Sequence, residues 1–183
     1  LSSSSAASDV YKRQVWPISV MALAASSLAA FAHTGVDDTH GFMHGLLHPI
    51  GGLDHTLAMV AVGLFAVHLG GRALWLLPAT FVLIMTAGGI LGMNGVEIPY
   101  VEVGIAASVV ALGLMLASGT TIPAGLAMGI VGFFAIFHGH AHGAEMPASA
   151  AGLSYAIGFM MATAALHGIG IVIGLAIATA GRT

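Results

Sequence analysis

Long apolar stretches separated by short polar breaks make up most of the chain. A helix needs about 20 mainly apolar residues to cross the hydrocarbon core of a bilayer. Four stretches approach this length and a fifth exceeds it: residues 53–69, 73–91, 98–117, 122–137 and 153–180. The fifth fits one tilted span, or one span with an extension interrupted near Gly168 and Gly170. The pattern therefore predicts an all-α, polytopic membrane helix bundle with about five spans.

Residues 44–55, HGLLHPIGGLDH, place polar side chains at the head of the first span. On a regular helix His55 would lie roughly 10 Å beyond His48. One ion cannot bind both across that gap, because metal–nitrogen bonds are about 2 Å long. Residues 49–52, Pro-Ile-Gly-Gly, are where a helix can break. We therefore expect a broken first span that gathers the two histidines with Asp54, which either coordinates directly or orients an imidazole.

Residues 137–145, FHGHAHGAE, close the fourth stretch. On a helix His138, His142 and Glu145 would share one face, because they are spaced by four and three residues. His140 would point away from that face. The three residues are therefore a second group of candidate metal ligands, and the alternative is a solvated histidine-rich loop with incidental metal affinity.

Other histidines are secondary candidates for binding or relaying a metal ion. His44 lies one helical turn before His48. His167 falls near the middle of the last stretch, where it would serve either as a relay for a crossing ion or as a structural hydrogen bond between helices. His68, close to Arg72, is expected at a membrane interface.

The N-terminus differs in character from the rest of the chain. Residues 1–14 are polar and serine-rich and lack an initiator methionine, so they are expected to be non-native. Two basic residues, the apolar run 15–32 and its Ala-Phe-Ala ending are the three parts of a signal peptide. A retained first membrane helix is the alternative. Cleavage at residue 32 would leave His33 at a new terminus, where its amine and imidazole would together hold a metal, and a membrane domain of residues 33–183.

The composition supports a membrane protein and narrows its chemistry. Of 183 residues, 58% are hydrophobic and 6% are charged, against about 25% charged residues in soluble domains. Four lysines and arginines leave no basic surface for nucleic acid. The absence of cysteine excludes disulfides and thiolate metal sites. Ten histidines are the anomaly, and imidazole with carboxylate but without sulfur suits nickel, cobalt and zinc.

The few basic residues also predict an orientation. The positive-inside rule places lysine and arginine in cytoplasmic loops. Counting spans from Lys12 and Arg13 puts Arg72 and Arg182 inside as well. The same count places the mature N-terminus and both histidine-rich segments at the outer face, where we expect them to form one site.

Three segments together resemble the HupE/UreJ family of nickel permeases. They are HPIGGLDHTLAMVAVGLFA, FHGHAHGAE and the ending YAIGFMMATAALHGIG. The family's first motif, His, five residues, Asp-His, is matched by His48, Asp54 and His55. Its second motif is matched at every fixed position, including the two histidines and the glutamate of the second candidate group. The likeness covers about residues 33–181.

The resemblance implies secondary uptake of a divalent transition metal, nickel, across the inner membrane for hydrogenase or urease maturation. Nickel is then a transported substrate and not a cofactor, the partners are the lipid bilayer and nickel-enzyme maturation proteins, and the chain is not an enzyme. Because relatives carry cobalt, the resemblance does not decide between nickel and cobalt. Two other functions are an intramembrane metal-dependent hydrolase, for which Ser108 and Ser154 are the serines in or beside spans, and a metal-binding subunit without flux.

Overall fold

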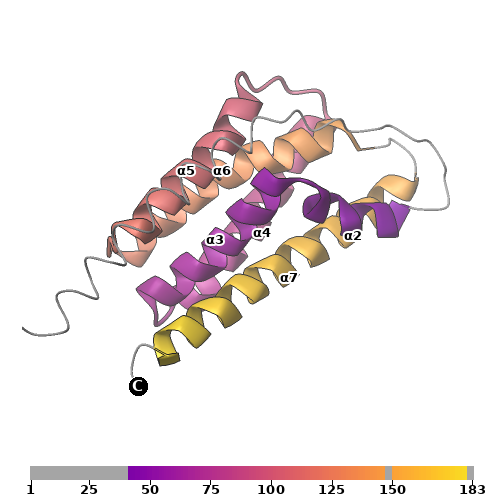
Figure 1. Ribbon diagram of the computed structural model, residues 1–183. Coiled ribbons are helices and arrows are strands. Elements are labelled where there is room, and N and C mark those ends of the chain that lie inside the picture. The colour runs from indigo at the N-terminus through magenta and orange to yellow at the C-terminus, as the bar shows by residue number, and fades with distance from the viewer. Residues whose placement is uncertain (1–40, 147–149, 181–183) are drawn as a thin grey trace, which may run out of the picture. The chain divides into compact units, whose positions relative to one another are not determined.

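The computed structural model describes residues 41–146 and 150–180, and all regular secondary structure in these ranges is helical. The predicted all-α fold is therefore confirmed. The predicted leader, residues 1–32, and the candidate ligand His33 lie outside the described residues. In chain order the helices are α2 (Gly41–Gly51), α3 (Leu53–Leu69), α4 (Ala73–Met93), α5 (Val101–Ala117), α6 (Ala124–Ala144) and α7 (Ala150–Ala180) (Figure 1).

Three of these helices are long and apolar enough to cross a membrane, namely α4, α6 and the part of α7 from Gly152–Ala180. The bent pair of α2 and α3 makes a fourth span if its two halves are taken together. Helix α5 is apolar but has 17 residues, fewer than the about 20 that cross the hydrocarbon core. The chain is therefore a multi-pass membrane protein, and helix length supports four of the about five predicted spans.

The first span is broken where the sequence predicts. Helix α2 contains Pro49 and ends at Gly51, and α3 begins at Leu53 after turning by 81°. Gly52 between them has extended backbone angles. Polar backbone groups freed by a break at membrane depth need new partners, and the Thr56 hydroxyl donates a hydrogen bond of 2.9 Å to the Pro49 carbonyl. The bend is therefore held by a specific bond.

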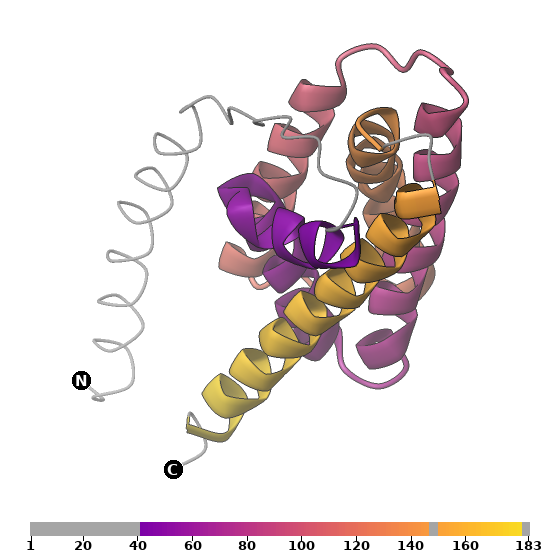
Figure 2. The same ribbon diagram turned by 90° about the vertical axis from the view of Figure 1, so that its right-hand side faces the viewer.

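Helix α6 lies between α4 and α5 (Figure 2), and glycines allow it to approach α4 closely. A Cβ atom at Gly139 would collide with the Met85 carbonyl oxygen, and one at Gly143 would collide with the Gly89 carbonyl oxygen. Small residues four positions apart permit this kind of packing between membrane helices. The glycines of the second histidine-rich segment therefore fix the position of the histidines beside them.

Two helices differ from the expected stretches. The fourth predicted stretch ends at Phe137, but α6 continues to Ala144, so the second histidine-rich segment is helical and is not a solvated loop. Helix α7 runs unbroken from Ala150 to Ala180, which excludes the predicted alternative of a glycine-interrupted extension. At Gly170 a Cβ atom would collide with the Val60 carbonyl oxygen of α3, so this glycine serves helix packing and not a break.

The six main candidate ligands, three from each histidine-rich segment, gather at one end of the bundle, which we call the cluster end. It holds the α2–α3 break, the last turns of α6 and the first turns of α7, which crosses α2 (Figures 1 and 2). The α4–α5 loop lies there too, because the His140 side chain of α6 bonds the Val96 carbonyl. At the opposite end His68 contacts the Thr120 carbonyl at 3.1 Å. Arg72, which follows α3, therefore lies away from the cluster end.

Candidate metal centre

Four histidine rings from α2, α3 and α6 adjoin one another at the cluster end. His142 lies among them, with its ring centroid 4.8 Å from that of His48 and 4.3 Å from that of His55. The His55 ring is in turn 4.8 Å from the His138 ring. The α2–α3 break allows this arrangement, because it directs two residues that would be far apart on a straight helix toward the same helix α6. We call these four residues the histidine cluster.

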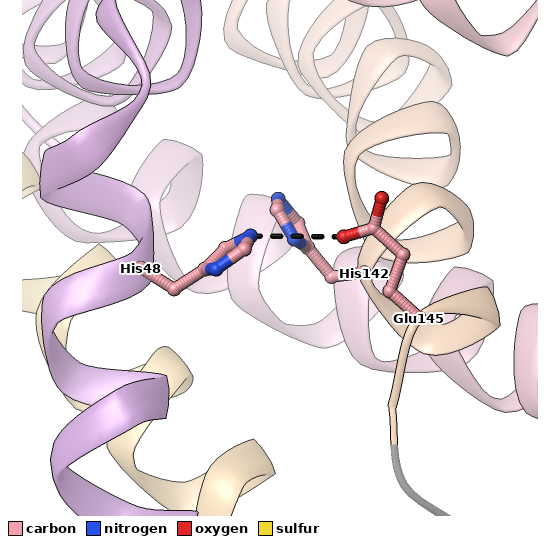
Figure 3. A group of neighbouring side chains, drawn as sticks. All are labelled: His48, His142 and Glu145. Atoms are coloured by element: carbon pink, nitrogen blue, oxygen red, sulfur yellow. Dashed lines mark ion pairs between the residues drawn. The ribbon is translucent and has the colours of Figure 1, made fainter. Parts of the chain in front are cut away.

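Glu145 joins the cluster at its exposed edge. One ligand atom from each of His48, His142 and Glu145 lies within 4.8 Å of the other two. The His48 Nε2 atom is 3.8 Å from the Glu145 Oε2 atom, and Figure 3 shows these side chains facing each other beside His142. Small side-chain movements would bring all three to the bond length of about 2 Å that an ion requires. The two predicted ligand groups therefore meet in space, while their role in binding metal stays a prediction.

Asp54 sets which nitrogen of His55 carries the proton. Its Oδ1 atom lies 3.2 Å from His55 Nδ1 and also accepts a 2.8 Å hydrogen bond from the His55 backbone N–H. A carboxylate only accepts hydrogen bonds, so Nδ1 is the protonated nitrogen and Nε2 keeps its lone pair. Within the described ranges the buried Nε2 atom has no hydrogen-bond partner. This geometry matches the orienting role that the sequence left as one of two alternatives for Asp54.

Ser108 of α5 sets which ring nitrogen of His138 carries the proton. Its hydroxyl donates a 2.6 Å hydrogen bond to the Ile105 carbonyl and lies 2.9 Å from His138 Nε2. A hydroxyl has one proton to donate, so His138 must donate from Nε2 and keeps its lone pair on Nδ1. That buried Nδ1 atom also lacks a partner among the described residues. Because His138 donates to Ser108, the pair is not arranged as a nucleophile and its base.

The cluster contains an unusual number of buried nitrogens without hydrogen-bond partners. In the described part of the chain both ring nitrogens of His142 belong to this set, together with His55 Nε2 and His138 Nδ1. Leaving a buried polar group unpaired costs about 1–3 kcal/mol, and native structures rarely do so. Neutral imidazole nitrogens with a fixed proton on the other ring nitrogen are the form in which histidine binds metal. The donor set therefore fits a transition-metal ion.

Aromatic side chains of α7 cover the cluster on one side. The Phe159 ring is 4.2 Å from the His142 ring, and the Tyr155 ring is 5.8 Å from the His48 ring. Both aromatic residues are buried, and such an apolar shell limits the access of water to a metal site. Sequence reasoning gave neither these two nor the role of Ser108. A lone hydroxyl inside an apolar span was a usable signal for Ser108, whereas nothing local distinguishes aromatic residues that line a site from those that pack a core.

The remaining candidate histidines lie outside this arrangement. His44 is exposed, with its ring 5.6 Å from that of His48. His140 points away from the cluster as predicted, and its Nε2 atom donates to the Val96 carbonyl at 2.6 Å. His68 is exposed at the opposite end. His167 is buried deeper in the bundle and contacts the Met59 carbonyl.

Comparison with known proteins places the chain in a family. The HupE / UreJ protein family matches residues 21–183, a range that includes both histidine-rich segments and every described helix. Protein HupE of Rhizobium leguminosarum bv. viciae is 47% identical over 150 residues, which cover 81% of this chain and 78% of that protein. No solved structure matches the chain. The chain therefore belongs to the HupE/UreJ family.

Proposed function

We propose that this protein is a permease that carries a divalent transition metal, nickel, into the cell. Membership in the HupE/UreJ family supports a metal permease role. The observation that carries the proposal is the meeting of imidazole nitrogens from three helices at the α2–α3 break. Nitrogen donors with one nearby carboxylate and no sulfur suit nickel, with cobalt as the competing ion.

The proposed entry path starts at the exposed edge of the cluster. The ion first meets Glu145 and His48, whose facing atoms are 3.8 Å apart. His142 adjoins both His48 and His55, so it passes the ion from the exposed edge to the buried pair of His55 and His138. Each transfer exchanges one imidazole for another, which keeps the ion coordinated while it loses water.

The proposed orientation puts the cluster end outside the inner membrane. Arg72 lies at the opposite end, where the positive-inside rule expects a cytoplasmic loop. Glu97 lies in the α4–α5 connection and Glu102 in the first turn of α5, both at the cluster end, where they would favour the approach of a cation. The membrane potential then drives uptake: at about 100 mV a divalent ion gains roughly 4–5 kcal/mol, twice the value for one elementary charge. This is enough for accumulation without ATP.

Radioactive nickel uptake tests the proposal directly. Cells without other nickel carriers should accumulate nickel when they produce this protein, and His142→Ala should abolish that uptake because the His142 ring adjoins both His48 and His55. His68→Ala is the matched control, since His68 is exposed at the other end of the bundle, and it should retain uptake. The same assay with excess unlabelled cobalt measures how strongly cobalt competes with nickel for uptake. Wild-type protein that reaches the membrane and carries neither nickel nor cobalt would refute the permease function.

The proposed use of the metal is the maturation of nickel enzymes. A hydrogenase or urease in the same cell would then need this permease at low external nickel. The enzyme's activity in a deletion strain, with and without added nickel, measures that link: activity lost at low nickel and restored by excess nickel is expected, and activity that is indifferent to the deletion contradicts it.

A further inference from the structure

His167 is a buried histidine that the outer cluster does not use. It lies in α7 with 1% of its surface exposed, and its Nδ1 atom is 2.8 Å from the Met59 carbonyl oxygen of α3. A carbonyl only accepts, so Nδ1 carries the proton and Nε2 keeps the lone pair. In the described part of the chain this buried Nε2 atom has no hydrogen-bond partner. His167 thus has the same tautomer as His55, and like His138 it keeps one buried ring nitrogen without a partner in the described structure.

One aromatic ring is a neighbour of both His167 and the histidine cluster. The Phe81 ring of α4 lies 5.5 Å from the His138 ring and 5.1 Å from the His167 ring. Met59, whose carbonyl holds His167, is one helical turn past His55 on α3, about 6 Å farther from the break. Among the described residues His167 is therefore the next imidazole below the cluster, and the buried Phe81 side chain packs against both His167 and His138.

A structural hydrogen bond alone would not account for this placement. The bond between α7 and α3 uses only Nδ1 of His167, and it gives no reason for the unpaired Nε2 atom that histidine leaves in the core. His140 also has an unpaired ring nitrogen among the described residues, but it lies at the α4–α5 loop and bonds Val96 there. His167 differs because it shares a ring neighbour with a cluster member.

We propose that His167 Nε2 is a second, deeper station for the divalent cation, which receives the ion from His138 past the Phe81 side chain that neighbours both rings. This inference rests on the proposed function of metal transport. Thr163 lies one turn before His167 on the same face of α7 and is fully buried. Its hydroxyl proton points toward the Met85 sulfur at 3.9 Å, so its oxygen lone pairs are available as a further ligand for the cation. A station with few ligands binds weakly, as a site on a conduction path must.

The first test separates the ligand from the hydrogen bond. In His167→Asn the side-chain amide can still donate to the Met59 carbonyl, but no imidazole lone pair remains. We expect nickel uptake to fall at least tenfold, while equilibrium nickel binding by the purified protein stays within about twofold of wild type because the outer cluster is intact. His140→Gln is the matched control, since it keeps a donor toward Val96 and should retain uptake. Wild-type uptake by His167→Asn, or loss of nickel binding together with uptake, overturns the proposal.

The second test needs no transport. The chain contains no cysteine, so His167→Cys introduces a single thiol at the proposed station. Cadmium added to the purified variant should produce the sulfur–cadmium charge-transfer absorption and saturate at the intensity of one thiol-bound cadmium per protein. Ala127→Cys places a thiol at a fully buried position of α6 and should give no such band. An absent band in His167→Cys, or an equal band in both variants, contradicts the station whether or not nickel is transported.

Discussion

Replacing Ser108 by alanine should weaken metal uptake although Ser108 lies in neither histidine-rich segment. The serine hydroxyl accepts the His138 Nε2–H bond at 2.9 Å, and both residues are fully buried. Without the acceptor, His138 has two alternatives. It keeps an unpaired N–H on Nε2, at a cost of about 1–3 kcal/mol, or it moves the proton to Nδ1. In the second case it loses the Nδ1 lone pair, which has no hydrogen-bond partner in the described structure and is the one assigned to the metal. Since about 1.4 kcal/mol corresponds to tenfold in affinity, we expect nickel to bind roughly 10- to 100-fold more weakly.

The assay is the nickel concentration that gives half-maximal uptake, measured with equal amounts of each protein in the membrane. Ser108→Ala should raise that concentration by the factor above. Ser154→Ala is the matched control, because Ser154 is exposed on α7 and should leave the curve unchanged. A Ser108→Ala curve that coincides with wild type would refute the assigned proton positions.

Three further predictions use the same protein. Gly139→Ala should destabilise the protein by about 1–3 kcal/mol, because the added Cβ atom would collide with the Met85 carbonyl oxygen. Gly129→Ala on the same helix is the control, since its Cβ atom would meet open space. Thermal unfolding in detergent compares the two variants, and equal midpoints would contradict the close packing of α4 and α6. His55→Ala and His138→Ala should each abolish nickel uptake at normal protein levels, and substantial uptake by either would remove that residue from the site. Uptake should fall only at an external pH below about 6.5, the ordinary pKa of a histidine side chain, because only neutral imidazole binds metal; uptake that rises as the external pH falls below that value would argue against histidine ligands.

The break in the first span was predictable because its causes are local. Proline removes a backbone donor and glycine destabilises the interior of a helix, so Pro49 and the Gly51-Gly52 pair mark the bend from the sequence alone. The meeting of the two histidine-rich segments also followed, since counting spans placed both at one face. Spacing in a helix was sufficient to separate His140 from His138 and His142.

The parts that escaped prediction depend on which helix faces which. The bond between Ser108 and His138 requires that one face of α5 meet α6, and no pattern in either helix specifies it. The contact of the Phe81 ring with both His138 and His167 has the same origin. The length of α6 was underestimated because histidines and glycines lower the apolar signal after Phe137, whereas close packing on α4 keeps that segment helical.

The central claim is that imidazole nitrogens of the histidine cluster hold the transported ion. X-ray absorption spectroscopy of the purified protein loaded with one equivalent of nickel measures the ligands directly. The account predicts nitrogen and oxygen ligands at about 2 Å, with the multiple-scattering signature of at least two imidazoles, and loss of imidazole scattering in His142→Ala. A spectrum without imidazole scattering, or one that His142→Ala leaves unchanged, would contradict it.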